Sequence, residues 1–245
     1  MNFLCESCSL KEEIEKNRIM LNNLILEENH RLIDEEIVKL SQSLDTLVYR
    51  CIFCNKNLNN NIFEIHLKNI FGTHSTFYYY GYQHLFNSMY FYINQGINNN
   101  ELIYISMEEN IYSELLAFLK VNNVSVQHIK FRPVKELIES NIMGGLIELK
   151  EKINNICLED EVKKYEGIRW IGQPTYAIQT TSQDAFLNWE INLSEALKNT
   201  NASLICIYDT YDYMTKGVFI NEKVIKQSLT THTFALKNSV LEKIN

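Results

Sequence analysis

The sequence predicts an α/β protein in which an N-terminal antiparallel helical hairpin precedes a mostly parallel sheet with helices on both faces. Before residue 55, apolar residues recur at helical spacing in two adjacent segments. After residue 72, short runs rich in β-branched and aromatic residues alternate with amphipathic helical segments, which is the pattern of βαβ units. The polar run NKNLNNN at 55–61 separates the two patterns.

The two N-terminal helices are expected at about 9–28 and 35–51. Asp34 is a suitable N-cap for the second helix, and acidic residues follow it in the first turn. A short connection between two helices makes them antiparallel neighbours, each covering the apolar stripe of the other. The stripes consist of Leu10, Ile14, Leu21, Leu24 and Ile25 in the first helix and of Ile37, Leu40, Leu44, Leu47, Val48 and Cys51 in the second.

The remaining chain alternates strands and helices. Strands are expected in STFYYY, LIYISM, VQHIKF, IRWIG, SLICIYD and THTFALK, with helices at 82–95, 109–120, from about 134, 182–198 and 221–229. We therefore predict a hairpin domain at 1–54, a linker at 55–71 and an α/β domain at 72–240. Ligands of parallel sheets bind at the carboxyl ends of strands. This rule directs attention to residues just past Tyr80, Met107, Phe131, Ile171 and Asp209.

The charge and the hydropathy of the sequence exclude two classes of binding partner. The net charge of −7 supplies no basic face for a nucleic acid. The chain contains no run of 18 apolar residues that could span a membrane. Its start, MNFLCESCSLKEEIEK, lacks the basic and apolar regions of a signal peptide. We expect a cytoplasmic protein that binds neither nucleic acid nor membrane.

Two C-x-x-C pairs, Cys5 with Cys8 and Cys51 with Cys54, flank the hairpin. Helices about 30 and 25 Å long would bring both pairs to the same end. Four thiolates there would hold a structural zinc ion tetrahedrally, with His66 and His74 as substitute ligands. The alternative is one free pair at the terminus and one pair buried in the stripe. The other two cysteines, Cys157 and Cys206, lie in apolar runs and are interpreted as buried structural thiols.

The second helix carries Ser41-Gln-Ser-Leu-Asp45, which places Ser41 and Asp45 one turn apart beside the apolar stripe. From composition alone, this is a solvated helix face. The segment around it, NNLILEENHRLIDEEIVKLSQSLDTLVYRC, resembles the stage zero sporulation protein E family of aspartyl-phosphate phosphatases, which are helical hairpins with an S-Q-x-L-D motif. The resemblance implies that Asp45 is the catalytic residue, with Ser41 and Gln42 as its motif partners, and that a phosphorylated response regulator is the partner.

An aspartyl phosphate is an acyl phosphate that already tends to hydrolyse, and the regulator brings its own Mg²⁺. A phosphatase then needs little beyond a group that positions water in line with the phosphorus atom. The carboxylate of Asp45 could accept a hydrogen bond from that water. Whether it acts as a base or only orients the water is left open.

Blocks across 72–240, among them GTHSTFYYY, IRWIGQPTY, WEINLSEAL, LICIYD and TTHTFAL, resemble the MEDS domain, a sensory domain named after methanogens, methylotrophs and the regulator DcmR. The resemblance implies a three-layer, RecA-like domain that has lost its phosphate-binding loop and senses a small ligand. No G-x-x-x-x-G-K-[ST] or G-x-G-x-x-G motif occurs in the chain, so no nucleotide is expected.

Four residues in these blocks fall near predicted strand ends and could supply the polar groups of an otherwise apolar ligand pocket: His74, Glu190, Asp209 and His232. Each also has a local interpretation as a strand-end cap, a surface ion pair or a core histidine. The aromatic run at 77–80 is interpreted as core.

These patterns together predict a signalling regulator that dephosphorylates the aspartyl phosphate of a response regulator of the sporulation phosphorelay type, under control of a small-ligand sensor. The hairpin is expected to rest against the sensor, so that one arrangement shields Ser41 and Asp45 and another presents them. Two alternatives remain open. The hairpin is a non-enzymatic adaptor that binds a regulator or forms a homodimer through its stripe, or the four cysteines form a redox or zinc sensor.

Overall fold

The computed structural model describes residues 10–26, 34–52, 64–68 and 70–244. Within these ranges an eight-stranded sheet runs in the order β1-β8-β7-β2-β6-β5-β3-β4. Strands β7, β2, β6, β5, β3 and β4 are mutually parallel, whereas β8 and β1 are antiparallel additions at one edge. The strands are β1 (Glu64–Ile65), β2 (His74–Tyr79), β3 (Leu102–Ser106), β4 (Ile129–Phe131), β5 (Ile168–Gly172), β6 (Ala202–Asp209), β7 (Phe234–Lys237) and β8 (Val240–Lys243).

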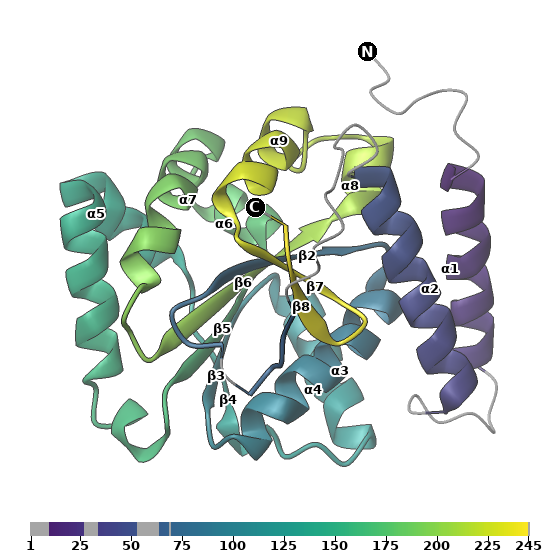
Figure 1. Ribbon diagram of the computed structural model, residues 1–245, viewed down its shortest axis with the longest axis horizontal. Helices are drawn as coiled ribbons and strands as arrows, with labels where there is room; N and C mark the ends of the chain where they lie inside the picture. Colours follow the sequence, from purple (N-terminus) through teal and green to yellow (C-terminus); the bar gives the residue numbers. More distant parts are fainter. Residues whose placement is uncertain (1–9, 27–33, 53–63, 69, 245) are drawn as a thin grey trace.

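Helices form the outer layers, and the sheet lies between them (Figure 1). Helices α3 and α4 contribute to the core on one face of the sheet, and α5, α6, α7 and α9 to the core on the other. The helices are α1 (Leu10–Leu26), α2 (Glu35–Ile52), α3 (Tyr82–Asn98), α4 (Glu109–Val121), α5 (Lys135–Cys157), α6 (Pro174–Thr180), α7 (Gln183–Leu197), α8 (Thr210–Thr215) and α9 (Glu222–Thr231).

The predicted fold class is confirmed: a helix pair precedes a mostly parallel, three-layer domain whose strand order β7-β2-β6-β5-β3 is RecA-like. Tyr80 and Gly81 alone connect β2 to α3.

Helices α6 and α8 and strands β1 and β8 were not predicted from the sequence. Lys237 of β7 pairs with Val240 of β8, so the two strands are joined by a two-residue turn at Asn238 and Ser239. Both turn residues have positive φ (51° and 64°), as a type I′ hairpin turn requires. Strand β1 and the buried residues Leu67 and Ile70 lie within the segment 55–71.

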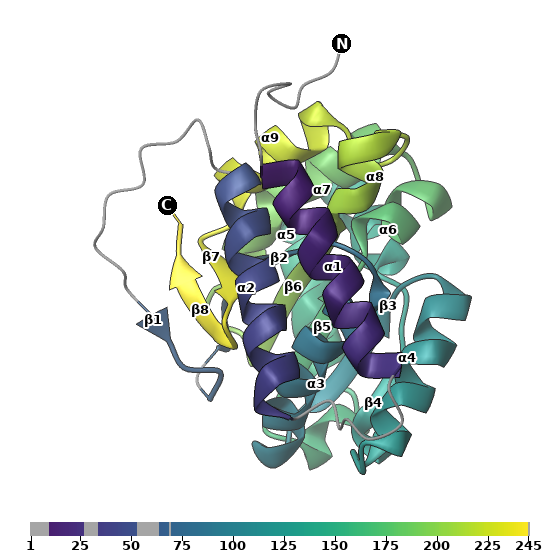
Figure 2. The same ribbon diagram turned by 90° about the vertical axis from the view of Figure 1, so that its right-hand side faces the viewer.

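The hairpin of α1 and α2 packs directly against the α/β domain, beside β7, β2 and α3 (Figure 2). Its stripe residues Ile14, Leu21, Ile37 and Leu44 are fully buried, in the same apolar cluster as Tyr78 of β2. Polar contacts join the two parts as well. With its amide oriented to satisfy its neighbours, Asn22 donates to Gln83 Oε1 at 3.0 Å, and Lys237 Nζ lies 5.1 Å from the centre of the Tyr49 ring.

A buried arginine, Arg169 of β5, ties several elements together on the α3 side of the sheet. Its guanidinium forms a bidentate ion pair with Glu101, at 2.6 and 3.0 Å. It also donates to the carbonyl oxygens of Tyr92 and Leu67, at 2.7 and 2.6 Å. The side chain of Arg169 is wholly buried and that of Glu101 is 2% exposed, so neither charge is solvated by water.

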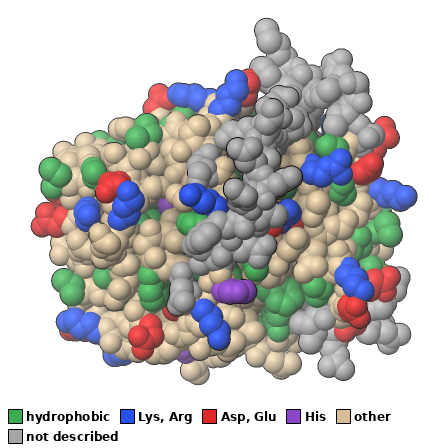
Figure 3. Space-filling model, in the orientation of Figure 1, with side chains coloured by type: hydrophobic (Ala, Val, Ile, Leu, Met, Phe, Trp, Pro, Cys, Tyr) green, Lys and Arg blue, Asp and Glu red, His purple; other side chains and the backbone are tan. Residues whose placement is uncertain are grey.

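On the face drawn in Figure 3, basic and acidic side chains are interspersed. Across the described ranges, no helix combines the length and the apolar character needed to cross a bilayer.

Candidate functional sites

Four buried side chains from separate elements converge beneath the sheet: His74 at the start of β2, Glu190 in α7, Cys206 in β6 and His232 after α9. Each residue is at most 2% exposed. We call them the His–Glu–Cys–His cluster. Strands β2 and β6 are neighbours in register, with Thr76 opposite Cys206. Because side chains alternate between faces, His74 and Cys206 point to the same face, which α7 and α9 cover.

The ligating atoms of the cluster are close enough to share one ion. Cys206 Sγ lies 3.1 Å from Glu190 Oε1 and 3.5 Å from His74 Nε2. Glu190 Oε1 lies 3.7 Å from His74 Nε2, and Glu190 Oε2 lies 3.6 Å from His232 Nε2. All four ligand atoms fall within 4.8 Å of one another. The cluster could therefore hold a metal ion.

Outer contacts set the tautomer of each imidazole. Ser194 donates its hydroxyl proton to the carbonyl oxygen of Thr231 at 2.6 Å, and its oxygen lies 3.0 Å from His74 Nδ1. That oxygen therefore accepts from His74 Nδ1–H. The Nδ1 atom of His232 lies 2.9 Å from the carbonyl oxygen of Ser228, which can only accept. Both neutral imidazoles thus carry their proton on Nδ1 and turn the lone pair of Nε2 toward Glu190.

The Glu190 carboxylate is held by hydroxyl groups as well. Tyr208 and Thr231 donate to its Oε2 at 3.2 and 3.0 Å. Burial lowers the pKa of His74 well below its ordinary value, and the nearby His232 lowers it further. Burial also lowers the pKa of His232. The pKa of the Cys206 thiol is raised by burial and then by Glu190. Both imidazoles are therefore neutral, which is the form that ligates metals.

Asp209, the fourth residue predicted for a ligand pocket, does not join the cluster. Its Oδ1 accepts the backbone N–H groups of Tyr211 and Asp212, at 2.9 and 3.3 Å, and so caps α8. Burial raises the pKa of Asp209 to about 6 despite these two bonds. The cluster also lies within the layer under the sheet, whereas the sequence analysis directed attention to the carboxyl ends of the strands.

We expect the stability of the Asp209→Asn variant, relative to wild type, to increase as the pH rises. Between about pH 4 and 6 the folded wild-type chain binds more protons at Asp209 than the unfolded chain. The free energy of unfolding of wild type therefore falls as the pH rises through this range. Asn caps helices as well as Asp and does not ionise. Between pH 4 and 7, the free energy of unfolding of the variant should rise by about 1–3 kcal/mol relative to that of wild type.

Urea unfolding at several pH values measures this difference. Asp184→Asn is the matched control for the substitution itself, because the Asp184 side chain is 88% exposed. A pH-independent stability difference between Asp209→Asn and wild type would contradict the raised pKa of Asp209.

The motif carboxylate of the hairpin, Asp45, is buried against the α/β domain. Its Oδ1 lies 2.6 Å from His84 Nε2, and its Oδ2 accepts the backbone N–H of Asn238 at 3.2 Å. The backbone N–H of Tyr80 donates to His84 Nδ1 at 3.1 Å, which leaves the imidazole proton on Nε2. His84 therefore donates to Asp45. We call these two bonds to Asp45 the hairpin latch.

The other motif residues divide between the interface and the solvent. Ser41 is buried, Gln42 is half-buried and Ser43 is exposed. Of the four cysteines predicted to bind zinc, Cys51 lies half-buried in the last turn of α2. Cys5, Cys8 and Cys54 fall outside the described residues, so this zinc site stays a prediction.

Two residues of these candidate sites, Cys206 and His84, were not predicted as site residues from the sequence. Cys206 was interpreted only as a structural thiol, although its spacing from Leu204 and Tyr208 indicates the same face of a strand. His84 drew no attention, because nothing local connects it with Asp45, 39 residues earlier.

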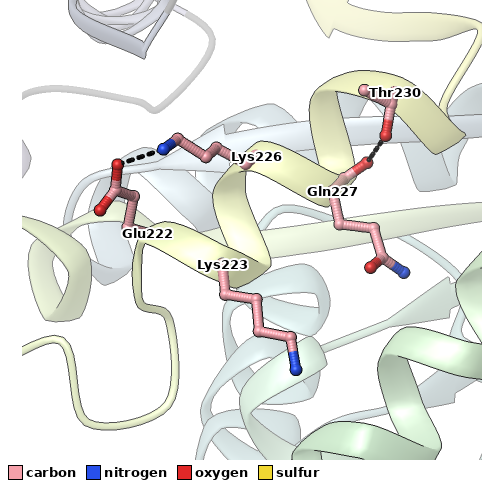
Figure 4. Close-up of a pocket in the computed structure, with 5 residues that line it drawn as sticks. All are labelled: Glu222, Lys223, Lys226, Gln227 and Thr230. Carbon is pink, nitrogen blue, oxygen red and sulfur yellow. Dashed lines mark hydrogen bonds and ion pairs between the residues drawn. The ribbon is translucent and has the colours of Figure 1, made fainter.

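Figure 4 shows the residues that line a hollow on α9. The volume of this hollow is about 480 Å³. The hollow is lined by Glu222, Lys223, Lys226, Gln227 and Thr230. Glu222 and Lys226 form an ion pair across one helical turn at 2.5 Å. Charged and polar groups thus line this hollow, and none of the His–Glu–Cys–His cluster reaches it.

Comparisons with known proteins give two family matches. Residues 73–233 match the MEDS domain, described as the methanogen/methylotroph, DcmR sensory domain. Residues 10–51 match the Spo0E-like sporulation regulatory proteins. No curated protein matches the chain.

Two solved structures show a distant likeness. A protein from Pyrococcus horikoshii OT3 is 11% identical, with a TM-score of 0.46 over 71% of this chain and 87% of that one. The flagellar accessory protein FlaH from Methanocaldococcus jannaschii is 12% identical, with a TM-score of 0.35 over 69% of this chain and 71% of that one. The MEDS match covers well over half of the 245 residues, and a Spo0E-like segment precedes it. The chain therefore belongs to the MEDS family of sensory domains.

Proposed function

We propose that this protein is a signalling regulator whose hairpin dephosphorylates the aspartyl phosphate of a response regulator under control of the MEDS domain. In this proposal residues 1–54 are the phosphatase part, 55–71 the linker and 72–240 the sensor. The observation that carries it is the hairpin latch: the motif carboxylate of a Spo0E-like segment is held by two groups of a sensory domain.

The hydrolysis reaction requires few groups from the hairpin. Water adds to the phosphorus atom, the bond from phosphorus to the regulator's carboxylate oxygen breaks, and both protons of the water remain on the released dihydrogen phosphate. Asp45 accepts a hydrogen bond from the attacking water and holds it in line, with Ser41 and Gln42 beside it on α2. The Mg²⁺ of the regulator neutralises the phosphoryl oxygens.

The latched arrangement is the inactive one in this proposal. Asp45 is 8% exposed, and each of its oxygens already has a hydrogen-bonding partner. A regulator cannot reach it until the hairpin moves from α3 and the β7–β8 turn. A ligand of the sensor acts by binding the latched and released arrangements with unequal affinity.

The test compares wild type with His84→Ala on a panel of phosphorylated response regulators, following the loss of acyl phosphate. His84→Ala removes the stronger bond of the latch and leaves the α2 motif intact. We expect it to speed dephosphorylation of the cognate regulator by about 5- to 150-fold, the usual range of a coupling between two states.

His66→Ala is the matched control, because His66 is an exposed histidine of the linker that the latch does not involve. Equal rates for wild type and His84→Ala would contradict regulation by the latch. If no regulator of the panel lost its phosphoryl group to any of the three proteins, the phosphatase function itself would be wrong and the adaptor alternative favoured.

A further inference from the structure

We propose that the His–Glu–Cys–His cluster is a closed, four-ligand site for a divalent metal ion of the zinc type. The ligands are Nε2 of His74, Nε2 of His232, Sγ of Cys206 and a carboxylate oxygen of Glu190. This site is separate from the four N-terminal cysteines, and it does not depend on the proposed phosphatase function.

The spacing of the donor atoms fits a tetrahedral ion. Zinc–ligand bonds of about 2.0–2.3 Å place neighbouring ligand atoms about 3.3–3.8 Å apart in a tetrahedron. The separations among Cys206 Sγ, Glu190 Oε1 and His74 Nε2 are 3.1, 3.5 and 3.7 Å. Small shifts of buried side chains would therefore complete the site.

A count of protons favours a cation at this position. The one thiol proton of Cys206 faces both Glu190 Oε1 and the lone pair of His74 Nε2, and it can serve only one of them. The lone pair of His74 Nε2 also faces Glu190 Oε1 at 3.7 Å, so two acceptors point at each other in a dry core. A divalent ion that displaces the thiol proton to solvent would satisfy all of these groups.

The outer contacts are those of a metal site. A ligating histidine usually donates its other ring N–H to a carbonyl, a carboxylate or a similar acceptor, which fixes its tautomer. His74 does so to Ser194, and His232 does so to the carbonyl oxygen of Ser228. The Glu190 carboxylate is oriented by Tyr208 and Thr231. These outer contacts engage Nδ1 of each histidine and not the Nε2 atom that faces Glu190.

The donor set selects the class of ion. Two imidazoles, one thiolate and one carboxylate suit Zn²⁺ better than Mg²⁺ or Ca²⁺, which prefer oxygen ligands. Four protein ligands leave no open position, so the ion is structural rather than catalytic. It would join β2, β6, α7 and the residue after α9. Its binding should therefore raise the melting temperature of the sensor domain.

The experiment uses the full chain with Cys5, Cys8, Cys51 and Cys54 changed to serine, so that only the buried site remains. We expect about one Co²⁺ per chain, with the visible absorption of a tetrahedral ion and a near-ultraviolet thiolate-to-cobalt band. Zn²⁺ at about a thousandfold excess over its Kd should raise the melting temperature by about 8–16 °C.

Cys206→Ser should remove the thiolate band, whereas Cys157→Ser, at a half-buried cysteine outside the cluster, should leave it unchanged. Glu190→Gln, which keeps the shape of the side chain but removes the anionic ligand, should weaken Co²⁺ binding by more than the roughly 10- to 100-fold that loss of an outer partner costs. If the four-serine chain fails to fold by circular dichroism, the same variants are made in wild type, where Cys206→Ser must remove one bound ion. A folded chain that takes up no ion, or an equal band in the Cys206 and Cys157 variants, would overturn the proposal.

Discussion

Asp45→Ala, made in the His84→Ala background, should abolish dephosphorylation of the cognate regulator. Removal of His84 first matters because the single substitution Asp45→Ala would leave the buried N–H of His84 without its acceptor, at a cost of about 1–3 kcal/mol. With both side chains removed, no imidazole N–H is left unpaired. The backbone N–H of Tyr80 loses its acceptor in His84→Ala and in the double variant alike, and that of Asn238 loses its acceptor in the double variant alone. Loss of the group that positions water should slow the chemical step by about 10²- to 10⁴-fold.

The measurement is single-turnover loss of acyl phosphate at saturating phosphatase, together with the affinity for the regulator. We expect the rate to fall while the affinity changes little, because in the proposed function Asp45 acts on the attacking water and not on docking. Ser43→Ala is the control, since Ser43 is an exposed motif neighbour on the same helix. A double variant as fast as His84→Ala alone would show that Asp45 has no catalytic role.

Arg169→Met should destabilise the fold by about 3–5 kcal/mol, which is the usual cost of leaving one partner of a buried ion pair uncompensated. The guanidinium is wholly buried, and its removal strands the Glu101 carboxylate and two carbonyl oxygens. Urea unfolding should show a lower midpoint with little change in slope.

A second substitution separates charge from packing. Glu101→Gln added to Arg169→Met removes the stranded charge and should restore part of the lost stability. Lys130→Ala is the control, because the Lys130–Glu161 ion pair is about half-exposed and such pairs contribute about 0–1 kcal/mol. If Arg169→Met lowered the free energy of unfolding no more than Lys130→Ala does, the buried ion pair would not stabilise the fold as its contacts indicate.

The hairpin and the alternation of strands and helices were predictable because both depend on local periodicity. Stripe residues such as Leu21 and Leu44 recur at helical spacing, and runs such as LICIYD have the length and composition of a buried strand. The helices α6 and α8 escaped prediction, since 7 and 6 residues carry little helical periodicity, and β1 has only 2 residues.

The candidate sites were predictable only in part. His74, Glu190 and His232 were selected from their blocks and do meet in the structure, but Asp209 caps a helix and Cys206 takes its place. Which face of β6 the helices α7 and α9 cover was not predictable from the sequence. Side chains that alternate between faces place Cys206 under α7 and α9, whereas Asp209 points to the other face.

By itself, the sequence determined the two-part organisation, the fold class and the motif with Asp45. Tertiary structure alone decided what those residues face. The pairs Asp45–His84 and His74–Cys206 are 39 and 132 residues apart, and no local pattern links them. Asp45 and His84 meet because the apolar stripe of the hairpin packs against the α/β domain. His74 and Cys206 meet because β2 and β6, which are distant in the chain, are adjacent parallel strands. Burial of apolar surface drives both events, and the polar groups that it brings together must then pair with one another.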